Sequence, residues 1–412
     1  MASRTLLLTG PYEALNHVAG AETVTPTSEA TGYEADNARD GEPGSKFKFN
    51  SAADPLTYLV DKNRLANGNF ETFTDPSAPD DWIDISNGTG ALSKETSLVN
   101  EGTGALKLTG GGAGNGALAR QNQTFLSWDR ITVSVAIRGD GTNSTFAFVK
   151  NKKTGHFLQA NGSWSATPAA FAGRSAASYD TTTVVGVDLQ TTEPGIVPLI
   201  FYVQTTTGVG YIDSFYCWPH SDFSAFFGHD LEAQLTVKIR IDDNDSPTFA
   251  NPTDVITHSS RRRPSFYAVS VSVISKRYVQ LHITGADLDA PGFGEWVLGR
   301  YVALPRQIMA PYRLTPDVGL IGDSPATSLR AEESMHQSFE FLAMDSELDA
   351  LKQQIMAAGR FGGNRTILVP DENDPEVYFG SMVYGSINNE RGYGRVRSVS
   401  ATFTEMDYGV DL

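Results

Sequence analysis

The stretch ITVSVAI, residues 131–137, decides the fold class of this chain. Large apolar side chains alternate with Thr132, Ser134 and Ala136, which is the period of a strand with one buried face. The same period returns in LTVKIRI (235–241) and YAVSVSV (267–273). Many such short strands separated by turns, with almost no helix, favour antiparallel β-sandwiches. The sequence therefore predicts an all-β protein.

Composition limits the partners that this chain can have. Its 412 residues carry a net charge of −16, whereas a nucleic-acid backbone is bound by clustered Lys and Arg. Cys217 is the single cysteine, so no intrachain disulfide can form, and oligomerisation or bound metal would have to add stability instead. Residues 195–203, the longest apolar stretch, are too few to span a bilayer. No signal peptide is visible, and we expect synthesis in the cytoplasm without a membrane span.

Four stretches differ in composition and in the periodicity of their apolar residues, and they are predicted as separate structural units. Residues 1–62 are rich in turns, 63–220 form a self-contained β unit, and 221–330 return to strict alternation. Residues 331–412 contain the one convincing helix, capped by Ser346 and ended by Gly359, followed by strands. This last piece is therefore predicted as a small α+β segment.

Four elements in the middle block occur in the order found in a known family. They are NGNFE (67–71), Trp82, SLVNEGTGALKL (97–108) and YIDSF (211–215). The block resembles carbohydrate-binding jelly rolls of the family 4/9/22 type. The resemblance implies a jelly-roll sandwich over residues 63–220, with host surface glycan as a partner.

The flanks resemble two pieces of one discoidin-like sandwich. ADNARDG (35–41) is similar to its opening, with Phe47 or Phe49 where tryptophan is usual, and FFGHDL (226–231) and RYVQLHI (277–283) are similar to later parts. The jelly roll would then be inserted into a loop of this sandwich. Insertion costs little where the two ends of a surface loop lie close together.

The C-terminal segment resembles the closing part of phage minor tail proteins. The phrases that carry the resemblance are SFEF (338–341), TILVP (366–370) and VSATFTE (399–405). Together the three blocks imply a tail-tip protein of a tailed phage, located in the virion after synthesis in the bacterial host. Its partners would be other tail-tip or hub proteins and sibling copies in a homo-oligomer.

Glu71 and Asp213 are the candidate metal ligands. In the resembled jelly rolls these acids ligate a structural calcium ion, which takes six to eight oxygen ligands. The alternative is that both are ordinary surface or turn acids.

Aromatic side chains are the candidates for sugar binding, because sugar rings stack on flat aromatic faces. Core packing is the alternative for each of them. Trp164 lies in the polar stretch 161–165 and is the best candidate for exposure, whereas Trp82 has acidic neighbours and could go either way. The predicted carbohydrate-binding residues are Trp82, Trp164, Tyr179 and Tyr202.

Catalysis has little support in the sequence. No HExxH or GxSxG motif occurs, and no pair of acids is placed by a recognised hydrolase motif. We therefore expect a non-enzymatic structural and adhesion protein. Two alternatives stay open: a polysaccharide-degrading depolymerase or esterase, and an architectural protein whose jelly roll is only a spacer.

Overall fold

The computed structural model describes residues 6–50, 55–112, 116–191, 195–231, 234–258, 265–285, 291–303, 336–344, 364–370, 372–373, 377–388 and 396–406. In these ranges the only helical elements are α1 (Tyr12–Leu15) and the 3-10 turn η1 (Ala35–Ala38), and the rest of the regular structure is antiparallel β. The all-β prediction is confirmed. The predicted helix between Ser346 and Gly359 lies outside the described residues. No described helix has the length and apolarity needed to cross a membrane.

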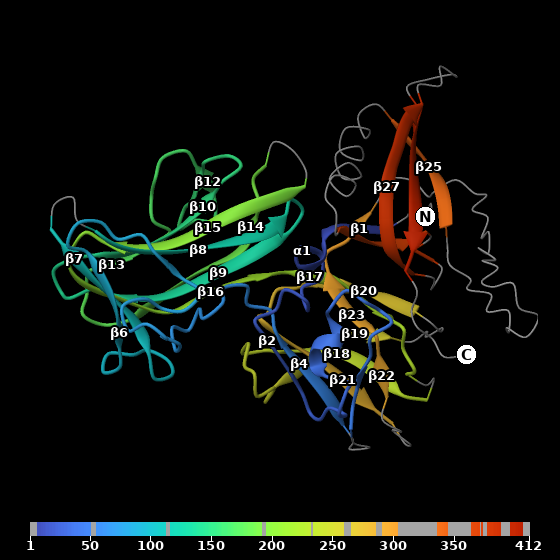
Figure 1. Cartoon of the computed structure of the whole chain (residues 1–412), viewed down its shortest axis with the longest axis horizontal. Helices are drawn as coiled ribbons and strands as arrows, with labels where there is room; N and C mark the ends of the chain where they lie inside the picture. Colours follow the sequence, from blue (N-terminus) through green and yellow to red (C-terminus); the bar gives the residue numbers. More distant parts are fainter. Residues whose placement is uncertain are drawn as a thin grey trace, which may run out of the picture.

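Residues 83–219 form two facing sheets, which make up the left lobe in Figure 1. Insert sheet 1 has the order β12 (Trp164–Ser165), β11 (Phe157–Leu158), β10 (Thr145–Asn151), β15 (Ile196–Thr205), β8 (Ala117–Leu126) and β5 (Ile83–Asp84), and β13 (Ala172–Arg174) also pairs with β10. Insert sheet 2 has the order β14 (Asp180–Asp188), β9 (Arg130–Arg138), β16 (Thr207–Pro219), β7 (Ala105–Gly111) and β6 (Ala91–Glu95).

The core of this lobe follows from strand alternation, with one correction by a bulge. Ile131, Val133 and Val135 of β9 face inward between the two sheets. In β16, the register shifts between Asp213 and Tyr216, and Ser214 has a φ of 59°. A β-bulge of this kind changes which residues face inward. Ile212 points into the core before the bulge, and Phe215 and Cys217 do so after it.

The flanking lobe is built from residues on both sides of the insert. Flank sheet 1 has the order β19 (Pro252–His258), β18 (Thr236–Asp242), β21 (Tyr278–Thr284), β4 (Leu56–Asp61) and β2 (Thr23–Pro26). Flank sheet 2 has the order β20 (Ser265–Ile274), β17 (Ser221–Phe227) and β23 (Glu295–Gly299), and β3 (Phe47–Lys48) pairs with β22 (Gly292–Phe293). Because β4 pairs with β21, the chain leaves this lobe after β4 and returns to it at β17. β4 ends at Asp61, and β17 begins at Ser221.

A third sheet joins the two ends of the described chain. This terminal sheet has the order β24 (Val302–Ala303), β1 (Leu6–Pro11), β26 (Asn364–Val369), β27 (Tyr378–Asn388), β28 (Val396–Glu405) and β25 (His336–Met344). β1 therefore pairs with the C-terminal segment rather than with the other strands of residues 1–62. Leu6, Leu7 and Leu8 are all buried, as expected for an internal strand covered on both faces. The sheet packs on β17 through a shared apolar cluster.

Candidate functional site

Aromatic and polar side chains gather on the face of insert sheet 1 that points away from the core, called the outer face below. Along β15, Leu199, Phe201 and Val203 point into the core, so the residues between them lie on the outer face. Strand register extends this face across the sheet. It forms three rows: Phe157–Lys150–Ile200–Asn122, Phe148–Tyr202–Arg120–Ile83 and Phe146–Gln204–Leu118.

Tyr202 lies at the centre of the aromatic part of the outer face. Its ring stacks on Phe148, with the centroids 4.7 Å apart and the planes inclined by 6°, and Phe157 meets it edge-on at 6.5 Å. Phe148 thus covers one face of the Tyr202 ring. Burial raises the pKa of Tyr202 from its ordinary value to about 12. The phenol is protonated at neutral pH, as an ordinary tyrosine is, and can donate a hydrogen bond.

The polar side chains beside Tyr202 have no partners within the described part of the chain. Arg120 forms neither a hydrogen bond nor an ion pair there, and its Nε is buried. The side chains of Asn122 and Gln204 and the Tyr202 hydroxyl also make no hydrogen bond to a described residue. Asn122 is exposed, so water can satisfy its amide, whereas the buried Nε of Arg120 costs about 1–3 kcal/mol if it is left unpaired and calls for an explanation. A bound ligand is one explanation.

Trp82 does not serve as a sugar platform, contrary to the sequence prediction. Its side chain is only 4% exposed, and its ring packs at 5.0 Å from Phe70 and 5.8 Å from Phe215. The indole Nε1 donates to the Ala66 carbonyl at 3.2 Å. Asp81 has a φ of 65°, so the chain turns here and places the acid in solvent and the indole in the core.

Trp164 and Tyr179 lie away from the outer face. Trp164 pairs with Leu158 across β11 and β12, so it shares the inward face and packs at the margin of the core, with its Nε1 donating to the Asp188 carbonyl at 3.0 Å. Tyr179 precedes β14 of insert sheet 2, and its hydroxyl donates to the Leu98 carbonyl at 2.8 Å. Of the four predicted sugar-binding residues, the structure therefore places only Tyr202 on the outer face.

Phe146, Phe148 and Arg120 complete the outer face and were not predicted from the sequence. The signal available was the pair of aromatics at positions 146 and 148, which must share one face of a strand.

Glu71 and Asp213 both bind the loop that precedes β7. Glu71 accepts hydrogen bonds from the N–H groups of Thr103 at 2.6 Å and Gly104 at 3.2 Å. Asp213 accepts them from the N–H groups of Asn100 at 2.7 Å and Glu101 at 3.0 Å. The two acids thus hold this loop from either end.

This donor set does not fit a calcium ion. Calcium needs six to eight oxygens turned toward one point. Here one oxygen of Glu71 and one of Asp213 each already accept two N–H groups. Among the described residues, no group of three or more His, Cys, Asp or Glu side chains could hold a metal.

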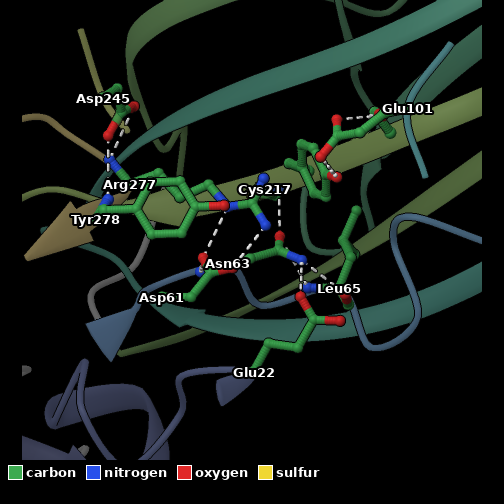
Figure 2. Close-up of polar contacts among 11 residues, drawn as sticks. Glu22, Asp61, Asn63, Leu65, Glu101, Cys217, Asp245, Arg277 and Tyr278 are labelled. Atoms are coloured by element: carbon green, nitrogen blue, oxygen red, sulfur yellow. Dashed lines mark hydrogen bonds and ion pairs between the residues drawn. The ribbon is translucent and has the colours of Figure 1, made fainter. Parts of the chain in front are cut away.

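A second polar region, called the joint below, connects the insert to the flanking lobe (Figure 2). Arg277 donates to both oxygens of Asp61, from Nε at 2.7 Å and from Nη2 at 2.5 Å. Its guanidinium lies 3.5 Å from the ring centroid of Tyr216 in the insert. Asp245 accepts the backbone N–H groups of Arg277 at 3.1 Å and Tyr278 at 3.0 Å. The flanking lobe thus contacts the insert through Arg277, whose charge is neutralised by the adjacent carboxylate of Asp61.

Asn63 fixes the chain where it passes into the insert. Its Oδ1 accepts the N–H of Cys217 at 2.9 Å, and its Nδ2 donates to Glu22 at 2.7 Å and to the Leu65 carbonyl at 2.8 Å (Figure 2). The outgoing and returning segments are therefore tied side by side. All of these groups are paired, which indicates a structural role for the joint.

Buried titratable groups lie next to the joint. His17 is hydrogen-bonded to Ser221 at 2.8 Å, and burial lowers the pKa of His17 to about 4. Burial likewise lowers the pKa of His220, bonded to Thr132, to about 3. Lys62 donates to the carbonyls of Pro219 and Ile274, and its pKa falls to about 7 by burial. Both histidines are thus neutral in the folded protein at neutral pH.

Comparison with known families and curated proteins gives no match to any family model and no match to any curated protein. Solved structures do show similarity. The enzymatically active domain of tailspike protein 4 from bacteriophage CBA120 is 15% identical with a TM-score of 0.26, covering 38% of this chain and 21% of that one. This chain therefore spans about a fifth of that tailspike domain.

Two carbohydrate-binding modules show a similar degree of likeness. A xylan-binding domain from Paenibacillus barcinonensis is 15% identical with a TM-score of 0.24, covering 37% of this chain and 90% of that one. A family 61 module solved with β-1,4-galactotriose is 15% identical with a TM-score of 0.26, covering 38% and 98%. At such scores the function of this chain has to be inferred from its own residues.

Proposed function

We propose that the insert binds carbohydrate on the outer face of insert sheet 1. The supporting observation is that an aromatic centre, Tyr202 stacked on Phe148, lies among polar side chains with no described partner. Ligand sites commonly combine aromatic surface with a few polar groups that fix orientation. The face of the Tyr202 ring that Phe148 does not cover would stack on a sugar ring. Asn122 and Gln204 can then exchange hydrogen bonds with its hydroxyls, since each amide both donates and accepts.

The whole chain is proposed to be a non-enzymatic structural component of a phage tail tip. The support is the combined sequence resemblance of the three blocks, together with the insert forming a lobe of its own (Figure 1). The flanking lobe and the terminal sheet would dock on hub proteins and sibling copies in the virion. The insert would touch host surface glycan during adsorption. Several symmetric copies would raise weak single contacts to a useful avidity.

Binding of the full-length protein to an array of host surface glycans tests this proposal. Tyr202→Ala is expected to weaken binding about tenfold, because an aromatic contact contributes about 0.5–1.5 kcal/mol beyond its buried area. The matched control is Tyr211→Ala, on insert sheet 2, which should bind as the wild type does.

Two results would favour one of the alternatives, a spacer or a polysaccharide-degrading enzyme. If the wild-type protein binds no host glycan, the insert is a spacer. If incubation releases oligosaccharides from host capsule or lipopolysaccharide, the protein is an enzyme. Equal affinity of wild type and Tyr202→Ala would move the binding site away from the outer face.

A further inference from the structure

We propose that the glycan bound on the outer face is anionic, with a carboxylate or phosphate group that pairs with Arg120. This inference rests on the proposed carbohydrate-binding function and adds the chemical class of the ligand. It also assigns a task to the arginine that the fold of the insert leaves without a partner.

The outer face is locally basic in a strongly acidic protein. The chain carries 48 Asp and Glu against 32 Lys and Arg. The three rows of the outer face nevertheless contain Arg120 and Lys150 and no carboxylate. Lys150 lies over the Phe157 ring, 5.3 Å from its centroid, and no described acid pairs with it. The charge of this surface therefore suits an anion.

Arg120 is placed where a ligand on Tyr202 would meet it. It pairs directly with Tyr202 on one side and with Ile83 on the other. Its guanidinium makes no described hydrogen bond or ion pair, and its Nε is buried. A guanidinium presents a planar fork of donors that matches carboxylate and phosphate groups with two parallel hydrogen bonds. A sugar stacked on Tyr202 with such a group at its edge would satisfy Arg120.

Arg138, on insert sheet 2, is a useful contrast because its Nε is also buried without a hydrogen bond. Its guanidinium lies 5.5 Å from the ring centroid of Tyr211. Tyr179 feels the charges of Arg138, Asp213 and Glu95 together, so two carboxylates share the neighbourhood of this arginine. An anionic ligand is therefore favoured at Arg120 and not at Arg138.

The net charge of −16 does not prevent this interaction under physiological conditions. At 0.15 M salt the Debye length is about 8 Å, so the distant acids are largely screened while the two nearby cations still act. At low salt the overall repulsion should slow association with an acidic polymer.

The test measures binding of the full-length protein to four polymers by calorimetry. Polygalacturonate carries carboxylates, its fully methyl-esterified form keeps the backbone without the charge, phosphomannan carries phosphate, and galactan is a neutral reference. We expect polygalacturonate or phosphomannan to bind at least about tenfold more tightly than the neutral polymers, because hydrogen bonds between charged groups are the strong ones. Which of the two is preferred identifies the anion.

Variants connect the preference to the arginine. Arg120→Met should lose roughly tenfold to a hundredfold in affinity for the acidic polymer, down to the level of the ester. Arg120→Lys keeps the charge without the fork and should fall in between. Lys107→Met removes a cation from insert sheet 2 and should change nothing.

The outcomes separate this inference from the function on which it rests. Equal binding of the acid and the ester, with no effect of Arg120→Met but a loss in Tyr202→Ala, overturns the anionic ligand and leaves carbohydrate binding intact. If neither the acidic nor the neutral polymers bind, and the host glycan array is also negative, the carbohydrate function itself fails.

Discussion

Arg277 in the joint and Arg120 on the outer face each have a tyrosine as neighbour, but their surroundings differ in one respect. Arg277 donates two hydrogen bonds to Asp61 and lies over Tyr216. Arg120 lies opposite Tyr202 and has no described partner. A polar group whose hydrogen bonds are all satisfied within the protein indicates a role in the fold. A polar group at the surface without such partners indicates a ligand-binding role. The two arginines should therefore respond to substitution in opposite ways.

The largest expected effect comes from breaking the joint. Asp61→Asn would leave the Arg277 guanidinium, which is 11% exposed, without its counter-charge. Removing one partner of a buried ion pair costs about 3–5 kcal/mol. The free energy of unfolding should fall by that amount in urea titrations followed by fluorescence.

The control for this variant is Asp254→Asn, which breaks a more exposed pair with Lys238 and Arg240. There we expect a loss below about 1 kcal/mol, since solvent screens such pairs. Equal losses in the two variants would show that the joint contributes no more than a surface pair.

Acid should weaken the joint through His17. Its pKa in the folded state is about 4, below the ordinary value of 6.5. Between pH 6.5 and 4, His17 is protonated in the unfolded chain but neutral in the folded protein. The free energy of unfolding therefore decreases as the pH is lowered through this window. The loss is on the order of 3 kcal/mol at pH 4.

His17→Gln should reduce the dependence of the melting temperature on pH between 6.5 and 4, and His220, whose pKa is about 3, should keep part of it. The control substitution is His156→Gln, which changes a histidine hydrogen-bonded to Gln190 in the insert. An unchanged slope in His17→Gln would assign the acid sensitivity to other groups.

Asp213 is a carboxylate that already accepts hydrogen bonds from two backbone N–H groups. Asp213→Ala leaves the N–H groups of Asn100 and Glu101 unpaired and should cost about 1–3 kcal/mol. Because the donor set does not fit calcium, millimolar calcium or a chelator should leave the melting temperature of the wild type unchanged. A calcium-dependent rise in the wild type that Asp213→Ala lacks would establish the metal after all.

The smallest effect is expected at Arg120. Arg120→Met removes a buried donor that has no described partner, so the free energy of unfolding should stay within about 0.5 kcal/mol of the wild type or rise slightly. A loss comparable to that of Asp61→Asn would show that Arg120 is structural, and the contrast between the two arginines would disappear.

Strand positions were predictable because alternation records burial directly. ITVSVAI at 131–137 lies within β9, and LTVKIRI at 235–241 overlaps β18. Alternation says which side chains share a face, but not which face is the core. On β10 the outer Phe146 and Phe148 are larger than the inner Ala147 and Val149. Side-chain size would therefore have assigned the wrong face of β10 to the core.

Features that depend on distant partners or local turns could not be predicted. The bulge at Ser214 brings both Ile212 and Phe215 into the core, which no strict period of two can do. Trp82 was misjudged because its acidic neighbours suggested a surface site, whereas the left-handed conformation of Asp81 separates them from the indole. Arg120 stands out only once strand register shows that no acid faces it.

The pairing of β1 with β26 imposes an order on biosynthesis. About 350 residues separate Pro11 from Asn364, its partner in the ladder. At a ribosomal rate of about 5–20 residues per second, β1 must wait roughly 20–70 s for that partner. The insert, whose sheets need only residues 83–219, can close long before. Until then the leucines of β1 lack the strand that pairs with them. A nascent chain that stalls before residue 364 would therefore expose an unpaired apolar strand, which can pair with other nascent chains on the same polysome.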